Sequence, residues 1–282
     1  MKIGSLCTGY GGLDMAVENV LGGDLAWYSE SDKHASKLLK QHLPGVPNIG
    51  DLTQIDWDRV EPVDVLTGGY PCQPFSNAGK KLGEHDERHL WPHIRQAIRV
   101  LRPRITFFEN VAAHLVRGFS TVLRDCAEDG LSVQWVTVGA SEAGAPHRRE
   151  RLFFIAADNN SEGLQGDCLQ PSRPLSFGER SGLADGLPGG FQWGEYAEAI
   201  NQWEATLGRR CPHPVEDNAN GRPRPTAQFY EWMMGLPEGW VTDPALGIPW
   251  GQQIKMCGNG VVPQQAELAL RHLLQRVTYD VS

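Results

Sequence analysis

Short apolar runs alternate with segments of helical periodicity over the first 156 residues of the chain. The apolar runs, which we expect to form buried strands, are 2–6, 25–28, 63–66, 104–108, 133–138 and 151–156. Helical periodicity is visible between several of them, at 13–21, 31–43 and 119–130. This alternation is the pattern of a parallel sheet with helices on both faces. We therefore expect an α/β fold with a doubly wound, Rossmann-like sheet.

The alternation stops near Asp158, and the chain as far as about Pro225 is rich in Gly, Pro, Ser and Asn without a clear period. An amphipathic helix is predicted again at 267–277. We expect three parts along the chain. They are a sheet domain at 1–156, a small irregular region with a hinge at 157–254, and a C-terminal segment at 255–282 that returns to the first domain.

The composition restricts the class of protein and its compartment. No leader sequence is visible, and no apolar run is long enough to span a bilayer. The six cysteines include no C-x-x-C pair, so neither a zinc ribbon nor a disulfide framework is indicated. We expect a cytoplasmic protein with reduced thiols. The net charge of −8 disfavours nucleic-acid binding through a broadly basic surface, so such a function has to rest on a local site.

A glycine-rich turn follows the first predicted strand. Gly9, Gly11 and Gly12 allow a tight turn into a helix and close approach of a ligand to main-chain N–H groups. The dinucleotide fingerprint G-x-G-x-x-G fails, because Asp14 stands at its last glycine position. Glu30 follows the second strand, and Asp51, in NIGDL, is expected at the end of a further short strand. The two carboxylates would complete a pocket for adenosine without a pyrophosphate. The alternative is a plain turn with two surface acids.

Chemically capable residues follow two later strands. Cys72 stands between two prolines after the third strand, and Glu109 ends the fourth, so both belong to the sheet edge where such folds place their sites. Arg149 and Arg151 precede the last strand and share one side if the segment is extended. Arginines of this kind hold phosphates or carbonyl oxygens. The alternatives are an inert buried thiol and ordinary surface ion pairs.

Seven motifs in order make the sequence resemble the cytosine-C5 DNA methyltransferase family of bacteria and phages. They are SLCTGYGG, YSESDK, GDLTQ, GGYPCQPFS, FFENV, GAPHRRER and CGNGVVPQQA. The resemblance covers nearly the whole chain except 158–220. It implies a sheet of the S-adenosylmethionine-dependent methyltransferase type and a small target-recognition region at 157–254. Cys7, Ser31 and His147 depart from the family pattern without removing a group that the chemistry requires.

The resemblance implies roles for individual residues. The catalytic residues would be Cys72, Glu109, Arg149 and Arg151. S-adenosyl-L-methionine would be bound by Cys7, Gly9, Tyr10, Gly11, Gly12, Glu30, Ser31, Asp51, Leu52, Gly69, Pro71, Leu90, Asn259 and Gly260. The substrate would meet Gln73, Ser76, Lys80, Lys81 and Asn110. No metal is expected, because the segment 85–89 has Asp86 where a zinc-protease helix needs glutamate.

The chemistry explains why these residue types occur together. A thiolate from Cys72 adds to C6 of cytosine and makes C5 nucleophilic. Glu109 offsets the negative charge that builds toward N3, and Arg151 holds the O2 carbonyl. A base stacked in duplex DNA is out of reach, so the cytosine must be flipped out, with 73–88 expected to close over the DNA. Double-stranded DNA, a possible cognate restriction enzyme and a monomeric state are the expected partners and assembly.

The sequence leaves the reading of DNA bases open. Arg173, Arg180, Arg209 and Arg210 are candidates for contacts to phosphate or guanine. Three other functions remain as alternatives. They are an RNA cytosine methyltransferase on the same scaffold, a non-catalytic DNA-binding homologue, and a nicotinamide-dependent oxidoreductase.

Overall fold

The computed structural model describes residues 1–71, 90–158 and 191–279. Its main sheet has six strands in the order β2-β1-β3-β4-β6-β5. The strands are β1 Lys2–Leu6, β2 Asp24–Ser29, β3 Val65–Gly69, β4 Ile105–Val111, β5 Leu131–Val138 and β6 Arg151–Asp158. The helices of this domain are α1 Gly12–Leu21, α2 Lys33–His42, α3 Trp91–Leu101 and α4 Phe119–Glu128. The Rossmann-like α/β fold expected from the alternation is confirmed.

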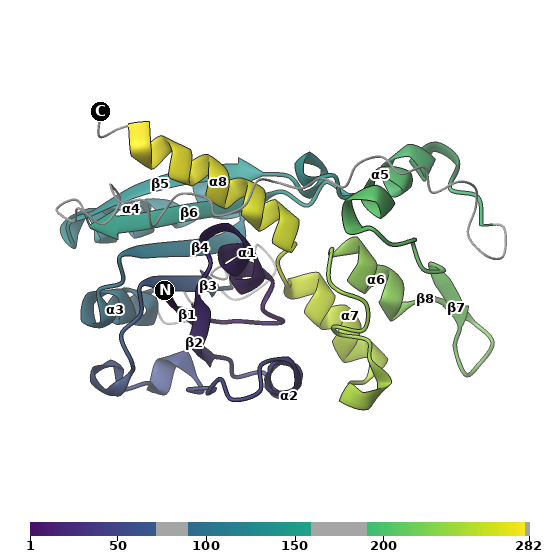
Figure 1. Ribbon diagram of the computed structural model, residues 1–282, viewed down its shortest axis with the longest axis horizontal. Coiled ribbons are helices and arrows are strands. Elements are labelled where there is room, and N and C mark those ends of the chain that lie inside the picture. Colours follow the sequence, from purple (N-terminus) through teal and green to yellow (C-terminus); the bar gives the residue numbers. More distant parts are fainter. Residues whose placement is uncertain (72–89, 159–190, 280–282) are drawn as a thin grey trace.

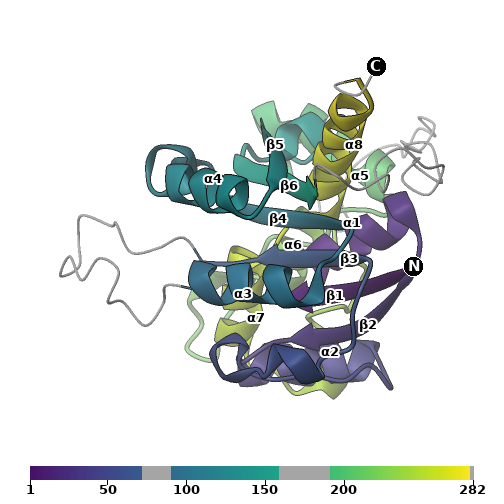
Figure 2. The same ribbon diagram turned by 90° about the vertical axis from the view of Figure 1, so that its left-hand side faces the viewer.

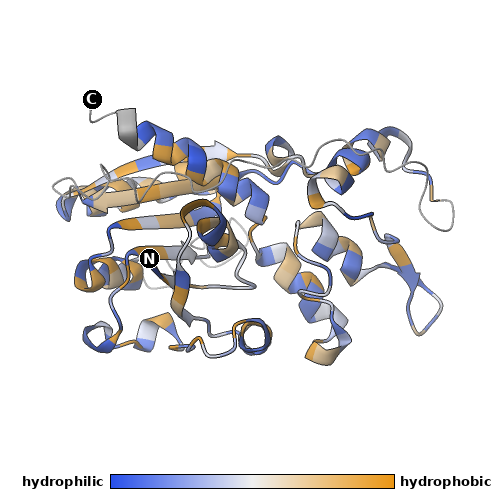
Figure 3. Ribbon diagram, viewed as in Figure 1, coloured by the Kyte–Doolittle hydropathy of each residue, from blue (hydrophilic) through white to orange (hydrophobic). Residues whose placement is uncertain are grey.

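Helices cover both faces of the sheet, as Figure 2 shows for α3 and α4 on one side and α1 on the other. Neighbouring residues of β4 and β6 supply the two cores in turn. Phe107 packs with Phe153 in the core that includes α1, and Phe108 packs with Phe154 in the core that includes α3 and α4. This two-residue alternation is the geometry of a strand buried on both faces. In Figure 3, β4 is accordingly hydrophobic over most of its length.

The last two strands differ from the predicted parallel arrangement. β1, β2, β3 and β4 pair in parallel, but β6 pairs antiparallel with both β4 and β5. The connection from β5 to β6 contains a short 3-10 helix at Ala140–Ala143 and no crossover helix. Parallel pairing needs a long crossover, so this short connection allows only the antiparallel arrangement. As a result, the first residue of β6, Arg151, lies opposite Val111 at the end of β4.

The C-terminal part of the chain begins with a smaller group of elements beside the sheet (Figure 1). They are α5 Ala197–Leu207, β7 Val215–Asp217, β8 Pro223–Pro225, α6 Ala227–Met233 and α7 Trp250–Asn259. The prediction that the chain is irregular as far as Pro225 is wrong for α5, whose buried Ile200 and Trp203 form its inner face. Two apolar residues within one turn, in a segment otherwise rich in Gly and Pro, are too few to give a clear helical period.

The final helix, α8 Pro263–Tyr279, packs against α1 and β5. The chain therefore returns to the sheet after α7, and the exact division of the domains at 156 and 254 stays a prediction. Across the described residues, no helix is both long and apolar enough to cross a membrane.

Candidate active site

The glycine-rich turn lies at the carboxyl end of β1 and leads directly into α1. Gly9 and Gly11 have positive φ angles of 61° and 86°, a region that favours glycine. At Gly12 the reason for glycine is space, because a Cβ there would lie 2.2 Å from the carbonyl oxygen of Val261. The main chain of the turn is thus held close to the C-terminal segment at Gly12.

Glu30 fixes this turn from the end of β2. Its two carboxylate oxygens accept hydrogen bonds from the main-chain N–H groups of Gly9 and Asp32, each at 2.7 Å. Burial raises the pKa of Glu30, and these main-chain donors oppose the rise. The carboxylate therefore stabilises the turn through these hydrogen bonds, and Glu30 also lines the adjoining cavity.

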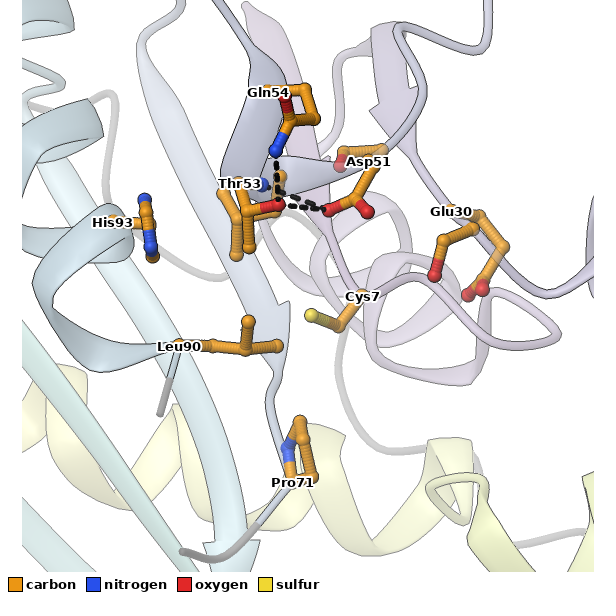
Figure 4. Close-up of a pocket in the computed structure, with 11 residues that line it drawn as sticks. Cys7, Glu30, Asp51, Thr53, Gln54, Pro71, Leu90 and His93 are labelled. Carbon is orange, nitrogen blue, oxygen red and sulfur yellow. Dashed lines mark hydrogen bonds between the residues drawn. The ribbon is translucent and has the colours of Figure 1, made fainter. Parts of the chain in front are cut away.

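Asp51 was expected at the end of a short strand, and this expectation is wrong. A single parallel bridge joins Tyr28 to Asn48, and Asp51 instead caps the 3-10 helix Leu52–Gln54. Its Oδ1 accepts hydrogen bonds from the main-chain N–H and the hydroxyl of Thr53, both at 2.9 Å. Figure 4 shows that the Asp51 side chain faces Cys7 across the pocket.

Two adjoining hollows form one cleft along this edge of the sheet. The first has a volume of about 730 Å³ and is lined by Cys7, Ser29, Glu30, Ser31, Asp51, Leu52, Thr53, Gln54, Pro71, Leu90 and His93. The second, of about 600 Å³, is bounded by the glycine turn, the ends of β3 and β4, Arg151 and the segment 255–261. Cys7, Glu30 and Pro71 line both hollows, so a ligand can extend from one into the other.

Glu109 stands in the second hollow, at the end of β4, and is only 7% exposed. Its Oε1 forms a salt bridge with Nε of Arg151 at 2.9 Å. Burial raises the pKa of Glu109 to about 7, although the charges of Arg151 and Arg149 partly offset the rise. A carboxyl group with this pKa can donate or accept a proton near neutral pH.

Asn110, the next residue of β4, was predicted to meet the substrate. Its Nδ2 donates to the carbonyl oxygen of Tyr70 at 3.0 Å, and its Oδ1 accepts from the N–H of Val111 at 2.9 Å. The Asn110 side chain therefore anchors the chain immediately before Pro71 and Cys72. Asn110 also lines the second hollow, so its contact with the substrate stays a prediction.

Arg149 does not continue the extended strand that follows it, because its φ angle is 25°. Its Nη2 donates to the carbonyl oxygens of Gly258 and Gly260 at 2.9 and 2.7 Å. The main-chain oxygen of Arg149 accepts from Nε2 of Gln265 at 2.7 Å. Arg149 thus ties the C-terminal segment to the sheet edge, while Arg151 alone pairs with Glu109.

Several predicted residues lie outside the described parts of the chain. They are Cys72, Gln73, Ser76, Lys80, Lys81, Arg173 and Arg180, together with the segment 85–89. Among the described residues, no group of three or more His, Cys, Asp or Glu side chains could hold a metal ion. Arg209, a candidate for DNA contact, donates from Nη2 to the carbonyl oxygen of Leu236 and is half-buried.

Comparison with known proteins agrees with this geometry. The profile of the family described as C-5 cytosine-specific DNA methylase matches residues 1–179, which is more than half of the chain. The chain belongs to this family.

Curated type II methyltransferases are similar to part of this chain. Type II methyltransferase M1.ScrFI of Lactococcus lactis subsp. cremoris is 34% identical over 186 residues, which are 64% of this chain and 47% of the relative. Type II methyltransferase M.HhaI of Haemophilus parahaemolyticus is 31% identical over 160 residues, 55% of this chain and 48% of the relative. The chain spans about half the length of these relatives.

Solved structures share the fold of this family member. The crystal structure of the S. pombe Dnmt2 methyltransferase aligns with a TM-score of 0.67 at 15% identity, covering 98% of this chain and 99% of that one. A putative DNA modification methyltransferase from a prophage of E. coli aligns with a TM-score of 0.60 at 18% identity, covering 99% of each chain. At these identities the likeness shows the fold alone.

Sequence reasoning missed some cleft residues of this methylase-family chain. Asp14 lines the second hollow, yet in the sequence it was noticed only as the residue that spoils a glycine fingerprint. His93 lines the first hollow from α3, a helix that had not been predicted. Gln265, behind the cleft, holds the main chain of Arg149; it lies within the motif CGNGVVPQQA, but no role was predicted for it.

Proposed function

We propose that this chain is a DNA (cytosine-5-)-methyltransferase that uses S-adenosyl-L-methionine and acts on a cytosine flipped out of duplex DNA. The observation that carries the proposal is the ion pair between buried Glu109 and half-buried Arg151. This pair opens on a cleft that also contains the glycine turn and Pro71, the residue before Cys72. Membership of the C-5 cytosine-specific DNA methylase family supports the same reaction.

The residues that line the cleft suit the chemistry of S-adenosylmethionine. The main chain of Gly9 and Gly12, the carboxylates of Glu30 and Asp51, and the apolar side chain of Leu90 line its two connected hollows. These groups suit a ligand with a ribose, an adenine ring and an amino-acid end but no phosphate. When bound, this cofactor supplies the electrophilic methyl group that the cytosine accepts. Ser31, Leu52, Asn259 and Gly260 line the same cleft.

The protein residues prepare the ring to accept that group. The thiolate of Cys72 forms a bond to C6, and the displaced ring electrons make C5 nucleophilic while charge builds at N3. Glu109 in its acid form donates a proton to N3, and Arg151 orients Glu109 and binds the O2 carbonyl. After methylation, C5 loses its proton to a base and the bond between Cys72 and C6 breaks, which restores the aromatic ring and the thiolate. N3 returns its proton to Glu109, so that neutral 5-methylcytosine is released and the acid form of Glu109 is restored.

The substrate is proposed to be double-stranded DNA. A stacked cytosine has its C6 covered by neighbouring bases, so extrusion into the cleft is required. The net charge of −8 indicates that DNA contacts are local. The two relatives described above are named Type II methyltransferases, and we propose by analogy a monomeric cytoplasmic enzyme with a possible partner restriction enzyme.

Transfer of labelled methyl groups tests the proposal. Duplex DNA incubated with the purified chain and radiolabelled S-adenosylmethionine should gain label in 5-methylcytosine, and RNA of the same sequence should gain none. Label in RNA alone would favour an RNA methyltransferase. The absence of label from both would favour a non-catalytic homologue.

The role of Cys72 has its own test. Cys72→Ser should abolish transfer and leave cofactor binding nearly intact, whereas Cys126→Ser, a buried thiol of α4 outside the cleft, should keep transfer. Duplex DNA with 5-fluorocytosine should form a covalent adduct with the unmodified chain, because C5 then carries no removable proton. Full turnover by Cys72→Ser would exclude this mechanism.

A further inference from the structure

We infer that Asp14 is the counter-ion for the positively charged end of bound S-adenosylmethionine, and that cofactor binding releases a proton from this side chain. The inference rests on the proposed function and adds a cofactor-binding residue to it. Asp14 lies in the first turn of α1, is 4% exposed, and lines the second hollow together with Gly9 and Gly12. It is therefore a buried acid at the wall of the cavity that would receive the cofactor.

The partners of Asp14 are neutral. Its Oδ2 accepts a hydrogen bond from Oγ of Ser5 at 2.9 Å, and its Oδ1 accepts one from Oγ1 of Thr67. These hydroxyls come from the neighbouring strands β1 and β3, so they fix the orientation of the carboxyl group. Among the described residues, no Lys, Arg or His forms an ion pair with Asp14 within 4.0 Å.

The other charged groups around the cavity have partners of their own. Glu30 accepts from main-chain N–H groups, Asp32 pairs with Lys255 at 3.2 Å, and Glu109 pairs with Arg151 at 2.9 Å. On α1 itself, half-buried Glu18 lies one turn beyond Asp14 and is not among the residues that line the cavity. On the packed helix α8, Glu267 accepts a hydrogen bond from Asn19.

The two titratable side chains of the turn add no positive charge either. Burial raises the pKa of Cys7 to about 12 and holds Tyr10 in its neutral form. Asp14 is thus an acid of the second hollow without a cation opposite it in the described structure. An ionised carboxylate in this position is costly, because burial removes its hydration without a compensating charge.

The missing charge matches the cofactor. S-adenosylmethionine carries a sulfonium and an ammonium group against one carboxylate, so its amino-acid end is net positive. Burial raises the pKa of Asp14 to about 7, and the hydrogen bonds from Thr67 and Ser5 limit the rise. A cation placed in the cavity favours the ionised form and lowers this pKa again. Binding near neutral pH must then be linked to proton release, and the affinity must fall as the pH falls below 7.

Calorimetric titration of the purified chain with S-adenosylmethionine measures this linkage. In buffers of different ionisation enthalpy at pH 7, the heat should reveal release of roughly half a proton, since about half of the Asp14 carboxyls are protonated before binding. Between pH 8 and pH 6 the dissociation constant should rise about tenfold if binding lowers the pKa by two units. Asp14→Asn should remove both the proton release and this pH dependence.

Glu109 titrates in the same range, so a matched variant is needed. Glu109→Gln should retain the proton release if Asp14 is its source. Glu18→Gln should retain it as well, with a midpoint at lower pH, because the charge of Glu18 contributes to the raised pKa of Asp14. If Asp14→Asn does not fold, Thr67→Val serves instead. Loss of its hydrogen bond should raise the Asp14 pKa further and move the midpoint of proton release to higher pH.

Binding without proton release by the unmodified chain at pH 7 would overturn the role of Asp14. Unchanged release in folded Asp14→Asn, or loss of release in Glu109→Gln, would overturn it as well. Each of these results leaves the methyltransferase proposal standing, because the cofactor still binds. Absence of cofactor binding in the unmodified chain at every pH would instead contradict the proposed function itself.

Discussion

The ring of Tyr10 lies against Gly260 so closely that a Cβ on the glycine would be 1.9 Å from Cε1 of the ring. The hydroxyl of the same tyrosine donates to the carbonyl oxygen of Val261 at 2.8 Å. The glycine turn after β1 and the segment after α7 are therefore fitted to one another, although some 250 residues separate them in the sequence. One wall of the cleft is built from this contact.

Gly260→Ala should open that wall. The added methyl group has no room beside a fully buried tyrosine ring, so overpacking is expected to cost about 1–3 kcal/mol of unfolding free energy and to weaken cofactor binding. Urea unfolding and calorimetric titration with S-adenosylmethionine measure the two effects. Gly251→Ala is the control, since a Cβ there meets nothing within 4 Å. Equal behaviour of the two variants would contradict the packing described for Tyr10.

Gln265→Ala should loosen the strained main chain at Arg149. The Gln265 Nε2 donates at 2.7 Å to the carbonyl oxygens of both Val138 and Arg149, and the side chain is fully buried. Loss of this donor leaves two main-chain oxygens short of a partner, at a cost of roughly 1–3 kcal/mol. Urea unfolding measures the loss, with Gln228→Ala on the exposed side of α6 as the control. A loss no larger than that of the control would remove Gln265 from the support of Arg149.

Transfer should depend on Glu109 in its acid form. Since the pKa of Glu109 is raised to about 7, its protonated fraction falls as the pH increases through 7. The ratio of single-turnover rates at saturating cofactor between the unmodified chain and Glu109→Gln should fall with it, because both chains form the Cys72 thiolate. Glu109→Gln should reduce the rate by about 10²–10⁴-fold. Glu150→Gln, an exposed acid next to Arg151, should leave the rate and its pH profile unchanged. A ratio of the two rates that stays constant as the pH rises through 7 would argue against a proton donated by Glu109.

Stability at low pH should depend on Asp129 at the junction of α3 and α4. Its carboxylate forms salt bridges with Nε of Arg95, at 2.7 Å, and with Arg99. These bonds lower the folded-state pKa to about 2, so the stabilisation is present above the unfolded pKa near 3.9 and is lost as the pH falls toward 2.

Asp129→Asn should therefore reduce the unfolding free energy at pH 7 by ~1–2 kcal/mol, after allowance for solvent screening. The difference from the unmodified chain should shrink between pH 4 and pH 2 in urea unfolding experiments. Asp56→Asn, which breaks an exposed pair with Arg59, should have less than ~0.5 kcal/mol of effect. A penalty for Asp129→Asn that is the same at pH 7 and pH 2 would rule out the ion pairs as its cause.

The sheet was predictable because buried strands appear in the sequence as short apolar runs. The runs at 2–6 and 151–156 lie within β1 and β6, and each supplies residues to the buried cores. The direction of β6 was not predictable from the same signal. Apolar composition does not distinguish parallel from antiparallel pairing, and the deciding feature was the lack of a crossover helix between Val138 and Arg151.

The site was predictable only as far as main-chain position determines it. Glu109, at the end of a predicted strand, lies where the strand order places it. The individual contacts of Asn110, Arg149 and Arg209 escaped prediction, because each side chain bonds to a carbonyl oxygen of the chain itself. Such bonds depend on how distant segments come together, and a sequence pattern carries no trace of them.

The reversed course of β6 has a consequence for protein engineering. The strand starts with Arg151 in the cleft and runs away from it, so that Asp158 ends at the opposite rim, beside Leu131. Whatever is joined to the chain after Asp158 is therefore attached at a distance from the reacting centre. Exchange of the stretch between Asp158 and Phe191 with that of another methylase would leave the described contacts of Glu109 in place. Asp158 is therefore a suitable junction for building chimeras.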